Sequence, residues 1–537
     1  MKSMGRRTYL ISLGISILFT LFILSGQWSG AEGLSKGYYA AQGIACLLLF
    51  FAGTLGLFWI RDRFGWKLRT EDGQDFMEKR GIGVKREYLF ALLAILLLYL
   101  PAFLAVFPGI FGYDGPGEIL QFFSDREPVT AHHPLAHELL LAGCFHLGYF
   151  LFGDYNPGLM LYSIVQSVTV AACAAYAVIW LRRRRIAFGY RVAALLFFGL
   201  NPLIQMLAYN TTKDTLYGAF FLLVFLLLLD LLETWNRRRA IGFAAAAILM
   251  CLFRNQGYYI LAFVCLGIFV FLRKRGGKVC GILLISAAAG WFFMGPLISI
   301  LQIPKGDPRE MLSVPMQQMA AVWKADQADL IAMDEEDRIL LEELIDPPCL
   351  DQYLPNCSDP VKSGFRTEVL KERPMEYLQL YLRLGSANTR IYLRAFGQML
   401  SGVWDITQYG EYRYLLYTNT FPENNVCNIQ RSGFLKEYEY YLINTADRLD
   451  QMVGLRWVLS PVLPAWLMFL NFGVALREKN RKSACALLLL FGQWGIMLLS
   501  PIVLVRYAFP MIACVPTLVY LLLGNGEKRT AEGTGDD

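Results

Sequence analysis

The chain has 537 residues, of which 55% are hydrophobic and only 18% are charged, and its mean hydropathy is +0.40. A composition this apolar excludes a water-soluble globular protein. The net charge of +6 does not indicate nucleic-acid binding, because the basic residues form short clusters between apolar runs. We therefore expect a membrane protein without a nucleic-acid partner.

Apolar runs of roughly 20 residues recur along the whole chain, and each is long enough to cross a bilayer core. We predict an all-α polytopic membrane protein with about 12 transmembrane helices. The first run is expected to be a retained helix and not a signal peptide, because a second run follows closely. The predicted spans are 8–26, 38–60, 88–107, 158–181, 188–208, 215–233, 240–254, 257–272, 279–303, 452–475, 483–500 and 504–523.

The basic clusters predict the orientation of these helices. With the spans placed as above, the clusters all fall on one side of the membrane, which the positive-inside rule makes cytoplasmic. We therefore expect a multi-pass protein of the cell membrane with both termini in the cytoplasm. The clusters are Lys2/Arg6/Arg7, Arg61 to Arg86, Arg182 to Arg185, Arg237 to Arg239, Arg273 to Lys278, Arg477 to Lys482 and Lys528/Arg529.

The same rule identifies two hairpins with outward turns. Arg239 and Arg273 both belong inside, so the chain between them crosses an even number of times and turns near Arg254. By the same argument, the segment 483–523 is a hairpin that places Arg506 at or just below the outer surface.

Two outward loops are large enough to carry the function. The second is polar, interrupted by proline and in part helical, so we expect a folded cap. It contains Cys349 and Cys357, and whether these form a disulfide stays open. The expected domains are the N-terminal hairpin and cytoplasmic loop 1–87, the transmembrane core 88–303 with the first outer loop 108–157, the extracytoplasmic cap 304–451, the C-terminal transmembrane helices 452–524 and the cytoplasmic tail 525–537.

Asp114 is the first candidate for a catalytic group. It follows the third span in a Gly- and Pro-rich stretch that continues to Glu118, so its carboxylate is expected close to the membrane surface. There it is placed to act as a general base on a lipid-borne substrate. The competing interpretation is structural, with Asp114 capping a short helix that starts near Pro116.

The first outer loop also holds all four histidines of the chain: His132, His133, His137 and His146. Pro134 is expected at the first position of a helix, which puts His133 at its cap and His137 on the same face. This pair is suited to bind an anion, to position a hydroxyl, or to join Asp114 and Glu118 around a divalent metal. The spacing is not that of a metalloprotease, so we favour a site without metal or other cofactor. A structural role for some of the histidines stays open.

Three isolated cations are expected near the outer ends of otherwise apolar helices: Lys213, Arg254 and Arg506. A cation near the membrane interior is costly unless it is paired, and arginine presents a planar fork that suits phosphate. We expect the three to converge on one anionic group. The alternatives are that Lys213 and Arg506 are snorkelling anchors and that Asp214 is the N-cap of the helix that follows it. Gln317 is a weaker candidate for contact with a sugar, against a place in an amphipathic helix.

The layout resembles the GT-C class of membrane glycosyltransferases, which includes the protein O-mannosyltransferases and the lipid A aminoarabinose transferases. The resemblance rests on the many spans, an early acidic outer loop and a second outer domain late in the chain. More closely, the chain is similar to poorly characterised bacterial proteins of this type over roughly residues 88–523. The shared motifs are Pro108-Gly109 to Asp114, His133-Pro134, Lys213-Asp214, Pro315 to Gln318 and Arg506-Tyr507.

The resemblance implies transfer of a sugar from an undecaprenyl-phosphate-type carrier to an envelope glycan, lipid or protein on the outer face, by an inverting single displacement. It also implies that Asp114 is the base and that Arg506 binds the donor phosphate. The hairpin 8–60, ahead of the acidic loop, departs from the mannosyl and aminoarabinose enzymes. The expected catalytic residues are Asp114, Glu118 and His133, and the expected substrate-binding residues are His132, His137, Lys213, Asp214, Arg254, Gln317, Arg506 and Tyr507.

Two other functions compete with this interpretation. A lipid-linked polysaccharide polymerase or ligase also uses a large outer loop, but depends on arginine and histidine more than on a carboxylate base. A transporter or flippase is less favoured, because the candidate residues lie at the outer mouths of the helices and not at the bilayer midplane, and no repeat relates two halves.

Overall fold

The computed structural model describes residues 5–30, 34–70, 75–124, 128–407, 425–447, 460 and 462–524. In these residues the regular structure is helical, and extended segments meet only in isolated bridges. Seven helical stretches are long and apolar enough to cross a membrane, or up to nine if each of two bent pairs is one span. The all-α class with several candidate spans is therefore confirmed, whereas the count of about 12 and the side of each loop stay predictions.

All the candidate spans except α6 overlap a predicted range. They are α1 (Arg6–Gly30), α2 (Lys36–Phe64), α4 (Val84–Val106), α6 (Leu135–Phe152), α7 (Asn156–Arg183), α10 (Lys213–Glu233) and the stretch made of α12 (Gly257–Leu272), α13 (Gly277–Met294) and α14 (Pro296–Ile300). Shorter helices are α11 (Arg237–Phe253), α24 (Leu463–Arg477) and α25 (Arg481–Met497). The start of the predicted span 452–475 and the polar tail after residue 524 lie outside the described residues.

Helices α12 and α13 lie side by side because the chain reverses at the 3₁₀ turn η2 (Arg273–Gly276). The thiol of Cys265 lies 3.8 Å from the carbonyl oxygen of Cys280, and the thiol of Cys280 lies 3.6 Å from that of Cys265. This agrees with the prediction of separate segments at 257–272 and 279–303.

The segment predicted as the first outer loop contains apolar helix, although its prediction as a loop implied none. It contains α5 (Gly115–Phe123) and α6, and α6 is long and apolar enough to be a candidate span. The C-terminal end of α6 is exposed: the exposed fraction is 82% for Phe150 and 66% for Phe152. Rings as exposed as these are suited to contact with lipid.

The predicted span 188–208 is bent. Helix α8 (Phe188–Leu200) and α9 (Pro202–Ala208) meet at an angle of 53°. Pro202 has no N–H to continue the hydrogen bonds of α8, and the side chain of Asn201 caps α9 by accepting from the backbone N–H of Leu203. The other bent pair is α26 (Val505–Ala513) with α27 (Val515–Leu523), at 47°.

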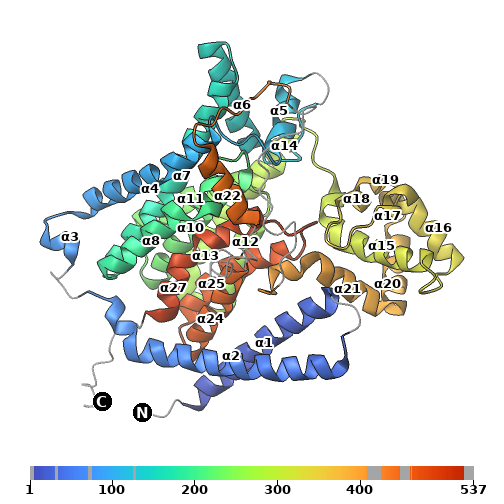
Figure 1. Ribbon diagram of the computed structural model, residues 1–537, viewed down its shortest axis with the longest axis horizontal. Helices are drawn as coiled ribbons and strands as arrows, with labels where there is room; N and C mark the ends of the chain where they lie inside the picture. Colours follow the sequence, from blue (N-terminus) through green and yellow to red (C-terminus); the bar gives the residue numbers. More distant parts are fainter. Residues whose placement is uncertain are drawn as a thin grey trace.

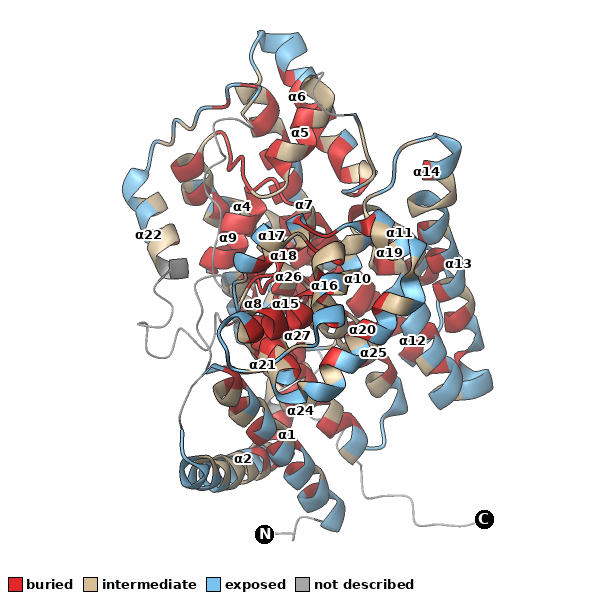
Figure 2. Ribbon diagram, turned by 90° about the vertical axis from the view of Figure 1, so that its right-hand side faces the viewer, coloured by how far each residue is buried: buried red, intermediate tan, exposed pale blue. Residues whose placement is uncertain are grey.

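Helix α10 lies at the centre of the bundle, and α2 lies at its edge (Figure 1). In the most apolar window of α10, 89% of the residues are buried, against 11% in α2. Figure 2 shows the same contrast, with buried residues gathered in the inner helices and exposed residues along α2. Lys213 and Asp214, at the first turn of α10, are therefore carried by the most enclosed helix among the candidate spans.

Three of the predicted basic clusters meet at one end of the bundle. Nε of Arg61 lies 2.8 Å from the Glu478 carboxylate, Nη1 of Arg184 lies 2.7 Å from that of Glu233, and Nζ of Lys482 donates to the carbonyl oxygen of Glu233 over 3.1 Å. The positive-inside assignment requires such a grouping of the basic clusters.

The segment predicted as the second outer loop contains a folded helical unit beside the bundle, which we call the outer unit after that prediction (Figure 1). Its helices share a core separate from that of the bundle, with Leu341, Leu350 and Leu380 completely buried. Helix α16 carries three acidic residues in its first turn, Glu335, Glu336 and Asp337. The helices of the unit are α15 (Ser313–Gln327), α16 (Glu335–Leu344), α17 (Pro347–Asp351), α18 (Asp359–Ser363), α19 (Thr367–Glu372) and α20 (Pro374–Ala387).

The chain returns from this unit to the bundle through α21 (Thr389–Leu400) and the 3₁₀ turn η4 (Ser401–Val403). α21 packs on α1, and α22 (Lys436–Asp447) packs on α4 and α9. All eleven cysteines are free thiols, so Cys349 and Cys357 are not joined in this structure.

Candidate functional site

The turn that carries Asp114 is fastened to the segment ahead of α10. Ile110 and Asn210 form an isolated parallel bridge. The Thr211 hydroxyl donates to the carbonyl oxygen of Gly112 over 2.8 Å and accepts from its N–H over 3.0 Å. Residues about 100 positions apart are therefore held together by contacts that involve the backbone. These contacts bring Asp114 close to Lys213.

Two positions in this turn admit only glycine. A Cβ on Gly109 would lie 2.2 Å from the Ser163 hydroxyl, and one on Gly115 would lie 2.3 Å from the Thr211 hydroxyl. Gly109 also has a φ of 150°, and Tyr113 adopts a left-handed φ of 53°, which is uncommon for a residue with a side chain. The strained residue directly precedes Asp114, as is frequent at functional sites.

Two cations hold the Asp114 carboxylate. Nη1 of Arg506 and Nζ of Lys213 each donate to Oδ2 of Asp114 over 2.8 Å. Burial raises the pKa of Asp114, but Arg506 and Lys213 outweigh it and hold that pKa well below its ordinary value. Asp114 occupies the N-cap position of α5, yet its side chain makes no capping hydrogen bond. The carboxylate therefore forms ion pairs with the two cations and does not cap the helix.

Asp214 holds the third cation. Its carboxylate is completely buried, forms an ion pair with Arg254 and lies 3.5 Å from Nε of Arg506. The structure thus brings Lys213, Arg254 and Arg506 together as expected, but around two carboxylates. Three cations meet two carboxylates in direct contact, and a Glu118 oxygen lies within 4.8 Å of Asp114, so an additional anion competes with these carboxylates for the cations. Asp214 is not the N-cap of α10, because Thr212 takes that place.

Aromatic rings surround the two guanidinium groups. The guanidinium carbon of Arg506 lies 4.5 Å from the centre of the Tyr113 ring and 5.0 Å from that of Tyr507. The Tyr507 ring also lies 5.0 Å from the guanidinium of Arg254, and its hydroxyl accepts from Nη2 of Arg506 over 3.3 Å. Rings at these distances stabilise the cations and keep the forks in place.

His133 joins the cluster as a neutral ring. Its Nδ1 lies 2.6 Å from Nζ of Lys213. Burial and the Lys213 ammonium lower the pKa of His133 to about 4. An ammonium only donates, so Nδ1 must accept and the proton sits on Nε2. His133 therefore offers a substrate a hydrogen-bond donor at neutral pH.

Glu118 and His137 form a separate buried pair. Oε2 of Glu118 lies 2.5 Å from Nδ1 of His137, and Nε2 of His137 lies 2.7 Å from the Tyr162 hydroxyl. That hydroxyl donates to Gln166, whose Nε2 in turn donates to the carbonyl oxygen of Asn210 over 2.8 Å. Tyr162 and Gln166 were not predicted. The signal was two polar side chains one turn apart in the apolar helix α7, where such residues are costly.

His133 and His137 were expected to share one face and bind together, but their side chains contact different partners. Pro134 is the N-cap of α6 and the helix begins at Leu135, one position later than expected. His133 turns to Lys213, whereas His137 turns to Glu118.

Asp114, Glu118 and His133 are the group of possible metal ligands found among the described residues, with one ligand atom of each within 4.8 Å of the others. Oε1 of Glu118 is buried and makes no hydrogen bond, so it is available as an acceptor. However, the Lys213 ammonium already lies between Asp114 and His133, and a divalent ion there would be repelled by it. The donor set thus fits a metal only if Lys213 moves away.

The outer unit approaches this site. The N–H of Ser358 donates to the carbonyl oxygen of Pro501 over 3.0 Å, five residues before Arg506. The N–H of Ala131, next to His132, donates to the carbonyl oxygen of Pro304 over 2.7 Å. His132 lies at the contact between the two predicted outer loops, and burial lowers its pKa.

Gln317 does not reach the site. It is buried in α15, where its Nε2 donates to the carbonyl oxygen of Leu354 over 2.5 Å. The side chain of Gln318 bonds Tyr392 and Tyr381 in the same unit. The apolar face of α15 packs into the core of the outer unit, so both amides support that unit and do not face Asp114.

The chain belongs to the DUF6020 family, described as a family of unknown function, whose model matches residues 124–536. The matched region includes the histidines, Lys213, Arg254 and Arg506, and begins after Asp114 and Glu118. Among curated proteins none matches the chain.

Proposed function

We propose that this DUF6020-family chain is a GT-C-type glycosyltransferase that moves a sugar from a polyprenyl-phosphate carrier to a cell-envelope acceptor. The observation that carries the proposal is the Asp114 carboxylate held between Lys213 and Arg506. A phosphate-linked sugar donor needs a cationic site for its phosphate and a base for the acceptor hydroxyl. Both lie in one contact network here.

The donor phosphate competes with Asp114 for the same two cations. In the structure without ligand, Lys213 and Arg506 lower the pKa of Asp114, which makes the carboxylate a weak base. A bound phosphate pairs with both cations and places a negative charge beside Asp114. Both effects raise the pKa of Asp114 toward that of an ordinary carboxyl. The base is therefore strengthened when the donor is in place.

The chemical step is a single displacement. Asp114 takes the proton of the acceptor hydroxyl as that oxygen bonds to the anomeric carbon of the sugar. The bond from this carbon to the phosphate oxygen breaks on the opposite face, which inverts the configuration. The polyprenyl phosphate leaves with the electron pair, and Lys213 and Arg506 stabilise its added charge.

Neighbouring residues orient the reactants. His133 donates from Nε2, and Oε1 of Glu118 accepts, so the two can bind hydroxyl groups of the sugar or the acceptor. Arg254 and Asp214 hold Arg506 in position. No step requires a metal.

We assign this site to the extracytoplasmic side and both termini to the cytoplasm. The support is that contacts join three basic clusters at one end of the bundle, whereas Lys213 and Arg506 lie at turns remote in sequence from those clusters. Labelling of single cysteines at residues 238 and 330 in intact cells tests the assignment, because only residue 330 is expected to react with a reagent that does not cross the membrane.

The proposal is tested with purified protein in detergent and synthetic polyprenyl-phosphate sugars. We expect release of polyprenyl phosphate from at least one donor, loss of this activity in Asp114→Asn, and weaker donor binding in Arg506→Ala. Asp154→Asn is the matched control, since Asp154 is exposed at the start of α7. Turnover by a folded Asp114→Asn protein at the native rate would exclude the carboxylate base.

A lipid-linked polymerase or ligase stays the second candidate, because His133 and Arg506 both contact the cluster. This reaction joins two lipid-linked glycans and is expected to depend more on His133 than on Asp114. Comparison of His133→Ala with Asp114→Asn on the same donors distinguishes the two.

A further inference from the structure

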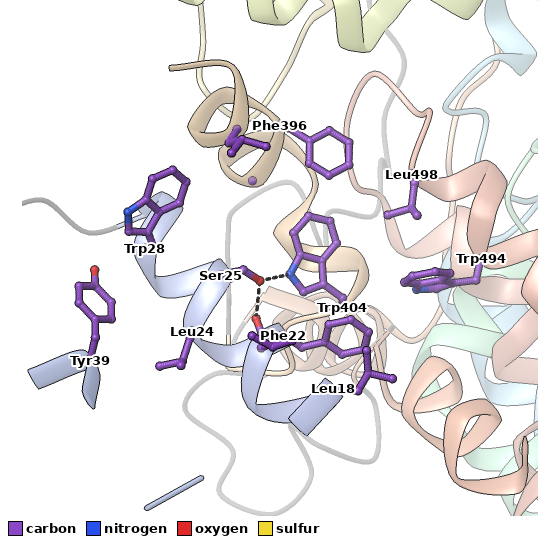
Figure 3. A pocket seen from close by; sticks show the side chains of 13 residues that line it. Leu18, Phe22, Leu24, Ser25, Trp28, Tyr39, Phe396, Trp404, Trp494 and Leu498 are labelled. Atoms are coloured by element: carbon purple, nitrogen blue, oxygen red, sulfur yellow. Dashed lines mark hydrogen bonds between the residues drawn. The ribbon is translucent and has the colours of Figure 1, made fainter. Parts of the chain in front are cut away.

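An apolar groove of about 750 Å³ opens between α1, α21, η4 and the outer end of α25 (Figure 3). It lies in the part of the molecule that the candidate site does not use. Six aromatic side chains line it: Phe22, Trp28, Tyr39, Phe396, Trp404 and Trp494.

Two indole N–H groups and one hydroxyl of this wall are already paired. Nε1 of Trp404 donates to the Ser25 hydroxyl over 3.0 Å, and that hydroxyl donates to the carbonyl oxygen of Phe22 over 3.1 Å (Figure 3). Nε1 of Trp494 donates to the carbonyl oxygen of Val403 over 3.1 Å. The lining is therefore mostly apolar side chains, which suits a hydrocarbon chain.

The groove continues an exposed stripe of α1. Leu10, Leu13, Ile17 and Leu21 recur every three or four residues and are 40% to 59% exposed. Leu21 also lines the groove. Because α1 is a candidate span, the stripe faces lipid, and a chain can enter the groove sideways from the bilayer.

Two arginines lie where the groove meets the outer unit. Arg390 is exposed one turn ahead of Leu393, which lines the groove. Nε of Arg394 donates to the carbonyl oxygen of Ser29, near the end of α1. Two arginines beside an apolar groove match an anionic headgroup.

Helix α25 separates this groove from the phosphate site. Gln493 accepts from the Tyr217 hydroxyl over 2.7 Å and donates to the carbonyl oxygen of Tyr507 over 3.0 Å. Its neighbour Trp494 points to the other side, toward Val403 and the groove. A donor whose phosphate lies at Arg506 thus stands across α25 from the groove.

We propose that the groove binds the hydrocarbon chain of a second membrane lipid with an anionic headgroup, and that this lipid is the acceptor. Three observations support the binding site: the groove, the exposed stripe of α1 and the two arginines. The role as acceptor rests on the proposed transferase function. It makes the acceptor class lipid, and not free glycan or protein.

The binding site is tested by photolabelling the full-length protein in vesicles with an anionic phospholipid that carries a diazirine in its acyl chain. We expect labelled peptides from α1 and α21, and about a tenfold loss of labelling in Leu393→Asp and in Arg390→Glu. Leu382→Asp is the matched control, because Leu382 is 58% exposed and Leu393 is 57% exposed, but Leu382 lies in α20 outside the groove. Both leucines are on the surface, so the folds are expected to survive.

Uniform labelling along α1 and α2, or labelling unaffected by Leu393→Asp, would overturn the site, as would filling of the groove by the chain's own residues 408–424. Competition by a polyprenyl phosphate would assign the groove to the donor and overturn the acceptor role. A raised KM for a lipid acceptor in Leu393→Asp, with the KM for the donor unchanged, supports that role. Labelling of the groove in a protein that turns over no donor would reject the transferase function and keep the lipid site.

Discussion

Lys213 donates a hydrogen bond of 2.8 Å to Asp114, although the two residues are 99 positions apart. Arg506, a further 293 positions beyond Lys213, donates to the same oxygen. One carboxylate oxygen is therefore shared by two cations, and an anion such as phosphate can compete for both of them.

Asp114→Asn separates the two roles of this carboxylate. We expect the rate of transfer to fall by about 100-fold or more, as for loss of a general base. At the same time, polyprenyl phosphate is expected to bind about tenfold more tightly, equivalent to about 1.4 kcal/mol, because Lys213 and Arg506 lose their internal anion. Titration calorimetry measures the binding. Weaker binding by the variant would show that Asp114 supports the phosphate site and does not compete for it.

Lys213→Gln is expected to create a metal site. The wild-type ammonium keeps a divalent ion from Asp114, Glu118 and His133, so activity should be insensitive to a chelator. Without that charge, the three ligands are expected to bind Mn²⁺, which electron paramagnetic resonance detects. Asp114→Asn in the Lys213→Gln background should remove the signal. Mn²⁺ binding by the wild-type protein, or inactivation by chelator, would contradict the metal-free mechanism.

His133 is expected to make the protein less stable as the pH falls from 6.5 toward 4. Its pKa is lowered to about 4 in the fold from an unfolded value of 6.5, so in this window the unfolded chain binds the extra proton. One pKa unit corresponds to about 1.4 kcal/mol, and partial exposure of His133 reduces the total effect to about 1 to 2 kcal/mol. Thermal unfolding in detergent across this range measures it. The fall should be smaller in His133→Asn than in wild type.

His137→Ala is expected to unfold the protein at a clearly lower temperature. The substitution leaves the buried Glu118 carboxylate without its partner, at a cost of about 3 to 5 kcal/mol. His137→Gln keeps one donor and should recover part of the loss. His146→Ala is the control, because His146 is exposed and its ring stacks on Phe123. Equal Tm values for His137→Ala and His146→Ala would mean that the pair contributes nothing to stability.

The convergence of the three cations was predictable because of their isolation. Lys213, Arg254 and Arg506 each interrupt an apolar region, and the cost of an unpaired charge near lipid requires a partner. That their partners are Asp114 and Asp214 follows only from the fold, since the contact joins α5, α10, α11 and α26. Sequence spacing carries no information on such distant pairs.

Local signals failed where several residues compete for the same place. Asp214 was expected to cap α10, but Thr212, two residues earlier, is the N-cap and leaves Asp214 to pair with Arg254. Gln317 was expected near the sugar because it opens the second loop, yet the apolar face of α15 turns it inward. The tertiary contacts of each helix decided these cases, and propensity did not.

Gln166 has a consequence for the timing of ligand capture. Nε2 of its amide lies within 3.2 Å of the carbonyl oxygens of Leu207, Ala208 and Asn210, and its Oε1 accepts from Tyr162, which contacts His137. The stretch leading to Lys213 is therefore pre-organised before any ligand arrives. Binding of a lipid therefore loses little conformational entropy of the protein. The free energy of its contacts appears as affinity and is not offset by the ordering of this stretch.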